Sequence, residues 1–139
     1  MKHRIVLVGI LLPLVAACGG EPKSSGAASA KPAAPSAVAA DPAAAKQAQQ
    51  LFDSLCFTCH GLTGHGDGPG AGALDPKPRS FADEAWQASV TDEQIEKTIV
   101  FGGAAVGKSP MMPAQPQLKG QDAVLDGLVA IVRRFRTKN

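Results

Sequence analysis

The chain has 139 residues, a formal net charge of +2, and few aromatic side chains, at 4% of the sequence with no Tyr. This length suits one domain, and the near-balanced charge gives no sign of a nucleic-acid partner. A small domain with so few aromatic residues has a thin apolar core, so a bound apolar cofactor would supply bulk that the side chains lack.

The first residues have the features of an export signal. Positive charge at Lys2 and Arg4 precedes an apolar run over residues 5–15. Such a run is too short to cross a membrane as a helix and is typical of a secretory signal peptide. We therefore predict a signal peptide over residues 1–17, whose removal leaves 12 basic and 12 acidic residues.

Cys18 directly follows this segment, after the sequence Val-Ala-Ala. These four residues resemble the lipobox of bacterial lipoproteins, in which the cysteine is lipidated and becomes the first residue of the mature chain. Ordinary cleavage after Ala17 is the alternative, because small residues also suit the general signal peptidase. A lipidated Cys18 predicts an exported protein on the periplasmic side, anchored to the inner or the outer membrane.

Residues 18–40 consist mainly of Ala, Pro, Ser and Gly with scattered charges. This composition cannot bury a core and predicts a disordered linker. The linker would span roughly 25 Å as a flexible coil and up to about 70 Å as polyproline II. A folded domain over residues 41–139 could therefore reach partners above a membrane surface.

The folded part begins with a predicted helix. Asp41 suits the N-cap and Pro42 suits the first helical position. The apolar residues that follow at helical spacing, and predict one buried face, are Ala48, Leu51, Phe52 and Leu55. The helix continues directly into Cys56.

The sequence Cys56-Phe57-Thr58-Cys59-His60 has the spacing of a covalent haem-attachment site. Residues three and four apart share one face of a helical turn, so both thiols and the imidazole lie on one side. The two thiols can then bond to the two vinyl groups of one haem, which leaves His60 as a nitrogen ligand of the iron. A zinc site would need more Cys or His ligands, and a thioredoxin-like site would need a neighbouring strand.

Residues 61–72 contain too many glycines for regular structure, and such a backbone can lie close to a flat ligand. Residues 74–81 continue as an extended loop, because residues before Pro avoid the helical region. We expect Pro69 or Pro76 to offer a backbone carbonyl to the second ring nitrogen of His60. Such a bond fixes the tautomer and orientation of a ligating imidazole.

The rest of the chain predicts further helices and no strand. Thr91 and Gln94 form a capping box, which marks a helix start. The expected elements are a short helix over residues 82–88 that contains Trp86, a helix from Thr91 to Gly102-Gly103, a proline-containing loop over residues 104–117 and a last helix over residues 121–136.

An iron bound by His60 needs a sixth ligand from a separate segment. A methionine sulfur suits electron transfer because it raises the reduction potential. The proline-containing loop offers Met111 and Met112, although both could simply fill space in the core. His65 lies only five residues after His60, so its loop would have to pass round the haem edge, and a solvated histidine is the simpler interpretation.

Taken in order, these elements resemble the class I c-type cytochromes: helix, Cys-x-x-Cys-His-Gly, glycine-rich loop, helix, Met-Pro loop and terminal helix. The resemblance covers residues 43–137. Three short sequences are similar to a bacterial single-haem branch of that family, namely Gly66-Asp67-Gly68-Pro69, Pro76-Lys77-Pro78 and Met112-Pro113-Ala114.

This resemblance implies an all-α, class I cytochrome c-like fold of about three to four helices around one covalent haem c with its iron. It implies that Met112 is the sixth ligand, with Met111 as the alternative, and that Trp86 donates its indole N–H to a haem propionate. Family members often carry an aromatic residue in the terminal helix near Ile131, whereas this chain has only Phe135 there.

These features predict an electron carrier rather than an enzyme, anchored to a membrane by lipid and exchanging electrons with redox proteins. Lys77, Arg79 and Lys108 could surround an exposed haem edge and attract an acidic partner. Two alternatives stay open. One is a haem enzyme or a gas or ligand sensor with an open sixth site, and the other is a cytochrome subunit fixed in a larger oxidoreductase.

Overall fold

The computed structural model describes residues 41–136. Within this part of the chain all regular structure is helical and no strand is present, which confirms the predicted all-α class. No helix among these residues is long and apolar enough to cross a lipid bilayer. The predicted signal peptide over residues 1–17, the linker over residues 18–40 and the lipidation site at Cys18 lie outside the described residues.

The N-terminal helix is continuous through three segments. They are α1 (Pro42–Leu51), the π-helical turn η2 (Phe52–Cys56) and α2 (Phe57–His60). Asp41 caps the helix as predicted, because its carboxylate accepts a 2.9 Å hydrogen bond from the N–H of Ala43. The helix therefore carries the Cys-x-x-Cys-His sequence at its C-terminal end.

Leu55 departs from the predicted buried face of this helix. Its side chain is 47% exposed, whereas Ala48 is fully buried at 0% and Phe52 is 3% exposed. A π turn contains one residue more than an α turn, so residues after Phe52 are rotated away from the face that α1 buries. Leu55 lies instead on the wall of a cavity.

The second half of the chain contains α3 (Glu84–Ser89), α4 (Asp92–Ala105), η3 (Pro116–Leu118) and α5 (Asp122–Arg134). The predicted capping box at the start of α4 is confirmed. The side chain of Thr91 accepts a 3.2 Å bond from the N–H of Gln94, whose side chain accepts a 2.9 Å bond from the N–H of Thr91. Gly102 breaks α4 with a φ of 76°, but one more turn follows, so the predicted end at Gly102-Gly103 is only partly right.

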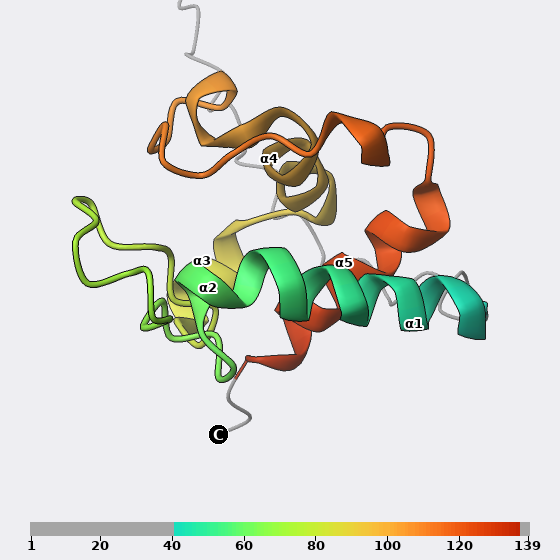
Figure 1. Cartoon of the computed structure of the whole chain (residues 1–139), viewed down its shortest axis with the longest axis horizontal. Helices are drawn as coiled ribbons and strands as arrows, with labels where there is room; N and C mark the ends of the chain where they lie inside the picture. The colour runs from blue at the N-terminus through green and yellow to red at the C-terminus, as the bar shows by residue number, and fades with distance from the viewer. Residues whose placement is uncertain (1–40, 137–139) are drawn as a thin grey trace, which may run out of the picture.

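In Figure 1 the N-terminal helix crosses the lower half of the molecule, α5 packs against α1, and α4 lies above them. The contact between α1 and α5 is close because small residues meet there. A Cβ atom added to Gly127 would lie 2.7 Å from the Cβ atom of Ala48. Any side chain at Gly127 would therefore push the two helices apart.

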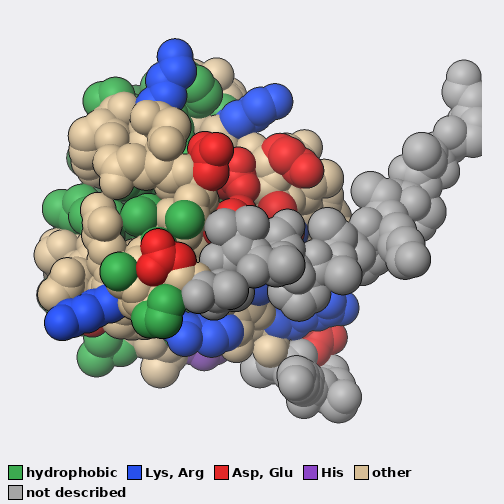
Figure 2. All heavy atoms as spheres, turned by 90° about the vertical axis from the view of Figure 1, so that its right-hand side faces the viewer, with side chains coloured by type: hydrophobic (Ala, Val, Ile, Leu, Met, Phe, Trp, Pro, Cys, Tyr) green, Lys and Arg blue, Asp and Glu red, His purple; other side chains and the backbone are tan. Residues whose placement is uncertain are grey.

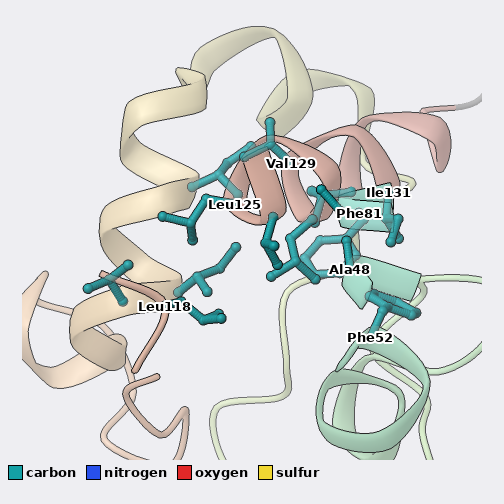
Figure 3. Packing of buried hydrophobic residues seen from close by; sticks show 14 residues of the cluster. Ala48, Phe52, Phe81, Leu118, Leu125, Val129 and Ile131 are labelled. Atoms are coloured by element: carbon teal, nitrogen blue, oxygen red, sulfur yellow. The ribbon is translucent and has the colours of Figure 1, made fainter. Parts of the chain in front are cut away.

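The hydrophobic core lies between α5, α4 and the N-terminal helix, as Figure 3 shows. The helix α5 supplies more of it than any other element, through Val124, Leu125, Leu128, Val129, Ile131 and Val132. Phe81, from the loop before α3, also belongs to this cluster. The loop that follows the Cys-x-x-Cys-His sequence is thus attached to the core at Phe81.

Arg133 joins the C-terminal end of α5 to the corner between α3 and α4. Its Nε atom donates a 2.8 Å hydrogen bond to the carboxylate of Asp92, and its Nη2 atom donates one of 2.8 Å to the carbonyl of Val90. The Nη1 atom donates a 2.9 Å bond to the backbone carbonyl of Gln87. This single side chain therefore fixes three segments relative to one another.

Acidic side chains gather on the face that Figure 2 presents. Among the described residues, Glu96 has the clearest electrostatic consequence of such crowding. Partial burial raises the pKa of the Glu96 carboxyl above its usual value, and the negative charge of Asp126 adds to this effect, followed by those of Glu93, Asp92 and Asp122. Ionised Glu96 is therefore unfavourable in the folded protein.

Candidate functional site

A cavity of about 600 Å³ opens beside the Cys-x-x-Cys-His sequence. Cys56, Cys59 and His60 line it on one side, while Met111 and Met112 come from the loop after α4. In Figure 1 this loop and α4 lie above the N-terminal helix. The apolar residues that complete the walls are Leu55, Leu74, Pro76, Pro78, Phe81, Trp86, Val90, Ile95, Ile99, Pro113 and Val132.

His60 has its ring fixed by one hydrogen bond. Its Nδ1 atom donates to the backbone carbonyl of Arg79 at 3.1 Å, and the side chain is only 8% exposed. A carbonyl can only accept, so the proton is on Nδ1 and the lone pair of Nε2 is free to bind a metal. Burial lowers the pKa of His60, against the opposing effect of the Arg79 carbonyl, and so keeps the imidazole neutral.

The carbonyl that faces His60 is that of Arg79, so the prediction of Pro69 or Pro76 was wrong. Pro76 does line the cavity, whereas Pro69 is exposed and does not. The extended path of the loop carries the chain past both prolines before it reaches the imidazole. The spacing of prolines in the sequence does not reveal where this loop comes closest to His60.

Phe81 stacks on His60. The ring centroids are 4.3 Å apart, and the planes differ by 14°. Phe81 is itself 8% exposed and belongs to the core cluster. Sequence reasoning missed this contact; the only signal was an aromatic residue at the end of a proline-containing loop.

Cys56 and Cys59 are free, partly buried cysteines on the cavity wall. Burial raises the pKa of the Cys56 thiol to about 11, and Cys59 contributes to the shift. Cys56 is therefore a neutral thiol at physiological pH, in apolar surroundings. These properties suit the binding of an apolar ligand at this wall better than the binding of a metal cation.

The loop that contains Met111 and Met112, here called the methionine loop, is hydrogen-bonded to α4 at Gly103 and at Ile99. The carbonyl of Met112 accepts a 3.0 Å bond from the N–H of Gly103, and the N–H of Gln115 donates a 3.0 Å bond to the carbonyl of Ile99. A Cβ atom on Gly103 would overlap the carbonyl oxygen of Ser109. Only glycine at this position lets the loop approach so closely.

The two methionines differ in their surroundings. Met111 is 57% exposed. Met112 is partly buried and packs against the core cluster. Both side chains still line the cavity.

Basic side chains gather at the rim. Lys77, Arg79 and Lys108 all line the cavity, and no Asp or Glu of the described residues does. Lys77 also donates to the carbonyls of two loop residues at 3.1 and 2.7 Å. Arg79 lies 3.3 Å from the carboxylate of Asp83 and places its guanidinium 5.9 Å from the centre of the Trp86 ring.

Two further predicted residues can be placed. Trp86 is partly buried and lines the cavity beside Arg79. His65 is exposed and takes no part in the cavity wall. The structure thus brings together Cys56, Cys59, His60, Met111, Met112, Pro76 and Trp86, and leaves Pro69 and His65 outside.

The cavity fits a covalently bound haem. Its walls are largely apolar, it contains two thiols in the correct spacing, and His60 has a free nitrogen lone pair. Leu55, an apolar residue on the cavity wall, is 47% exposed. A flat apolar group would cover Leu55 and supply the core volume that so few aromatic side chains leave missing.

A match to a protein-family model agrees with this fit. The sequence model for cytochrome c matches residues 45–130. The solved structure titled KustC0563 c-type cytochrome is similar to this chain, with 34% sequence identity over 65% of this chain and 98% of that one and a TM-score of 0.48. No curated protein sequence matches the chain. Because the family match covers more than half of the sequence, the chain belongs to the cytochrome c family: it is a c-type cytochrome, a haem-binding electron-transfer protein whose cofactor is covalent haem c with its iron.

Proposed function

We propose that the protein is a single-haem electron carrier in which Cys56 and Cys59 hold the haem covalently and His60 and Met112 are the axial ligands of the iron. One observation carries the proposal. The thiols, the imidazole and the methionine loop line the same apolar cavity, although the loop is more than forty residues away in the sequence. Among the described residues, this cavity is where a nitrogen ligand and a methionine sulfur lie beside the two thiols.

His60 is prepared for ligation before any metal arrives. Its Nδ1–H bond to Arg79 fixes the tautomer, and burial keeps the ring neutral. A carbonyl acceptor behind an imidazole also makes the other nitrogen a better donor to iron. The role of His60 is therefore to supply a permanent ligand in one orientation.

Met112 is a better candidate than Met111 for the second axial position. Its backbone is bonded to Gly103 and its side chain packs against the core, whereas Met111 is 57% exposed. Pro113 restricts the backbone of the residue before it, which further limits the movement of Met112. A thioether fixed in this way is a stable sixth ligand.

The bound haem supplies the one-electron redox change, and the protein sets its potential and access. A methionine ligand favours the reduced iron and raises the potential. The largely apolar walls would restrict the access of water and polar substrates to the iron, which favours outer-sphere electron transfer over substrate chemistry at the metal. Both axial positions are filled in this proposal, so the protein acts as a carrier and not as an enzyme.

The sequence before Asp41 supports a location outside the cytoplasm. A signal peptide over residues 1–17 would direct export, and lipid on Cys18 would anchor the domain to the inner or outer membrane from the periplasmic side. The linker over residues 18–40 would let the domain reach a redox protein that donates electrons and another that accepts them. The basic rim of Lys77, Arg79 and Lys108 suits an acidic partner surface.

Optical spectra of the haem-loaded protein test the proposal. We expect a low-spin reduced-minus-oxidised spectrum, a weak sulfur-to-iron band at the red edge of the visible range in the ferric form, and little binding of carbon monoxide by the ferrous form at neutral pH. Avid carbon monoxide binding without the sulfur band would contradict Met ligation. It would favour a sensor or a haem enzyme with an open sixth site.

A further inference from the structure

We propose that Gln87 is a positioning residue for His60: it acts through the backbone of Phe81 and thereby tunes the reduction potential. The inference rests on the proposed ligation of iron by His60. Gln87 lies on α3 and is 3% exposed. It does not line the cavity, so any effect on the iron must pass through other residues.

A short segment, residues 79–81, contacts the His60 ring from two directions. The carbonyl of Arg79 accepts the 3.1 Å bond from Nδ1. The ring of Phe81 lies nearly parallel to the imidazole at a centroid distance of 4.3 Å. A shift of this segment would change both the strength of the Nδ1 bond and the tilt of the imidazole.

Phe81 is hydrogen-bonded at both its backbone N–H and its backbone carbonyl. Its N–H donates a 2.6 Å bond to the carbonyl of Gly64. Its carbonyl accepts a 2.8 Å bond from Nε2 of Gln87. The Gln87 amide is the only side chain of the described residues that donates to this carbonyl, so it is the point at which α3 fixes the segment.

The side-chain amide of Gln87 is fixed in its orientation by further hydrogen bonds. Nε2 also donates a 2.9 Å bond to the carbonyl of Val132, and Oε1 accepts a 2.9 Å bond from Nη1 of Arg133. Arg133 is fixed in turn by its ion pair with Asp92 at 2.7 Å. Both amide hydrogens and the amide oxygen are therefore engaged, and the buried amide has one favourable orientation.

The hydrogen bond between His60 and Arg79 affects the reduction potential in a definite direction. A strong Nδ1–H bond makes the imidazole a more basic ligand, which favours ferric iron and lowers the potential. If Gln87 no longer holds Phe81, residues 79–81 become free to move and the Nδ1 bond to Arg79 weakens. The midpoint potential should then rise.

The test compares haem-loaded wild-type protein with Gln87→Met, which keeps the length and neutrality of the side chain and removes its hydrogen bonds. We expect a higher midpoint potential and changed paramagnetic shifts of the haem methyl groups, which report the orientation of the axial imidazole. Val129→Ala is the matched control, because it removes buried volume from α5 at a residue that does not line the cavity and makes no side-chain hydrogen bond. It should lower the melting temperature and leave the potential and the methyl shifts unchanged.

Phe81→Leu provides an independent variant that keeps the backbone bonds and removes the stacked ring. It should change the methyl shifts, and combining it with Gln87→Met should give less than the sum of the two effects, since both act on the same imidazole. If Gln87→Met does not accumulate in loaded form, Gln87→Glu carries the test, because its carboxylate still accepts from Arg133 but has no N–H to donate to the carbonyl of Phe81.

An unchanged potential and unchanged methyl shifts in a loaded Gln87→Met protein, together with a lower melting temperature, would overturn the inference and leave Gln87 a purely structural residue. If Gln87→Glu carries the test, unchanged methyl shifts in that variant would overturn the inference equally. A wild-type protein without a low-spin histidine-ligated spectrum would contradict the proposed function itself. The two failures are therefore distinguishable.

Discussion

The backbone N–H of Gly103 donates a 3.0 Å hydrogen bond to the carbonyl oxygen of Met112. This bond joins the break in α4 to the loop that carries the proposed sixth ligand. The same glycine accepts a 2.8 Å bond from the N–H of Lys108 at its own carbonyl. Gly103 therefore closes the methionine loop at two points.

Gly103→Ala should displace this loop, because the new Cβ atom would overlap the carbonyl oxygen of Ser109. We expect the free energy of unfolding to fall by about 1–3 kcal/mol, the usual cost of overpacking, and the sulfur-to-iron band to weaken. Thermal denaturation and ferric optical spectra would measure these effects. Gly72→Ala is the control, since nothing lies within 4 Å of its added Cβ atom; an equally large effect there would refute the explanation.

Replacement of the two methionines should separate their roles. Met112→Ala should abolish the sulfur-to-iron band, open the iron to carbon monoxide and lower the reduction potential, because a thioether favours ferrous iron. Met111→Ala should keep the band. Reversed behaviour of the two variants would identify Met111 as the ligand and leave the proposed carrier function intact.

Covalent attachment depends on Cys56 and Cys59. Extraction of the loaded wild-type protein with acidified acetone should leave its colour on the chain, and the intact mass should include one haem. The double variant Cys56→Ser with Cys59→Ser, expressed in the same host with haem-ligation machinery, should lose all colour to the organic phase. Colour lost from the wild-type protein under these conditions would contradict covalent attachment.

Glu96→Gln should stabilise the protein near neutral pH. Because burial and neighbouring carboxylates raise the pKa of Glu96 in the folded state, its favourable contribution is present below its unfolded pKa and is lost as pH rises through the folded value. Removing the charge should recover about 0.5 kcal/mol, a small value because the site is partly solvated. Thermal denaturation should show this gain near neutral pH and none at about pH 3, where the carboxyl is protonated in both states.

Glu93→Gln is the matched control for this comparison. Glu93 lies on the same helix, but its own backbone N–H and the Thr91 side chain lower the pKa of its carboxyl. Its negative charge is therefore favourable, and its removal should not stabilise the protein at neutral pH. Equal stabilisation by both variants would show that only total charge matters.

Cys18→Ser should release the protein from membranes or block its maturation. Lipidation requires the thiol, and the linker alone has no apolar segment to replace the anchor. Fractionation of cells followed by mass analysis of the mature N-terminus would measure the outcome. A native mature protein that begins with an unmodified Cys18 would exclude the lipid anchor.

Local sequence signals predicted the helix starts and the attachment motif well. The Asp41 cap and the Thr91–Gln94 box form as expected because each depends on residues three or fewer apart. Cys56, Cys59 and His60 also come together through local helical geometry alone. Such features need no knowledge of the rest of the fold.

The residues behind His60 could not be predicted in this way. The contacts of Arg79, Phe81 and Gln87 with His60, or with one another, depend on how a loop without regular structure returns across the core. Backbone carbonyls leave no mark in the amino-acid sequence, which is why the prolines were chosen wrongly. Leu55 was misplaced because the sequence does not reveal a π turn.

The π turn at Phe52–Cys56 gives the N-terminal helix two phases. Upstream, small residues such as Ala48 face α5, and downstream, Cys56 and His60 face the cavity. Each residue of a helix turns the chain by about 100°, so loss of a single residue between Phe52 and Cys56 would swing the thiols by a quarter turn or more. Variation in helix length at this place should therefore be poorly tolerated, even though the attachment motif itself would stay intact.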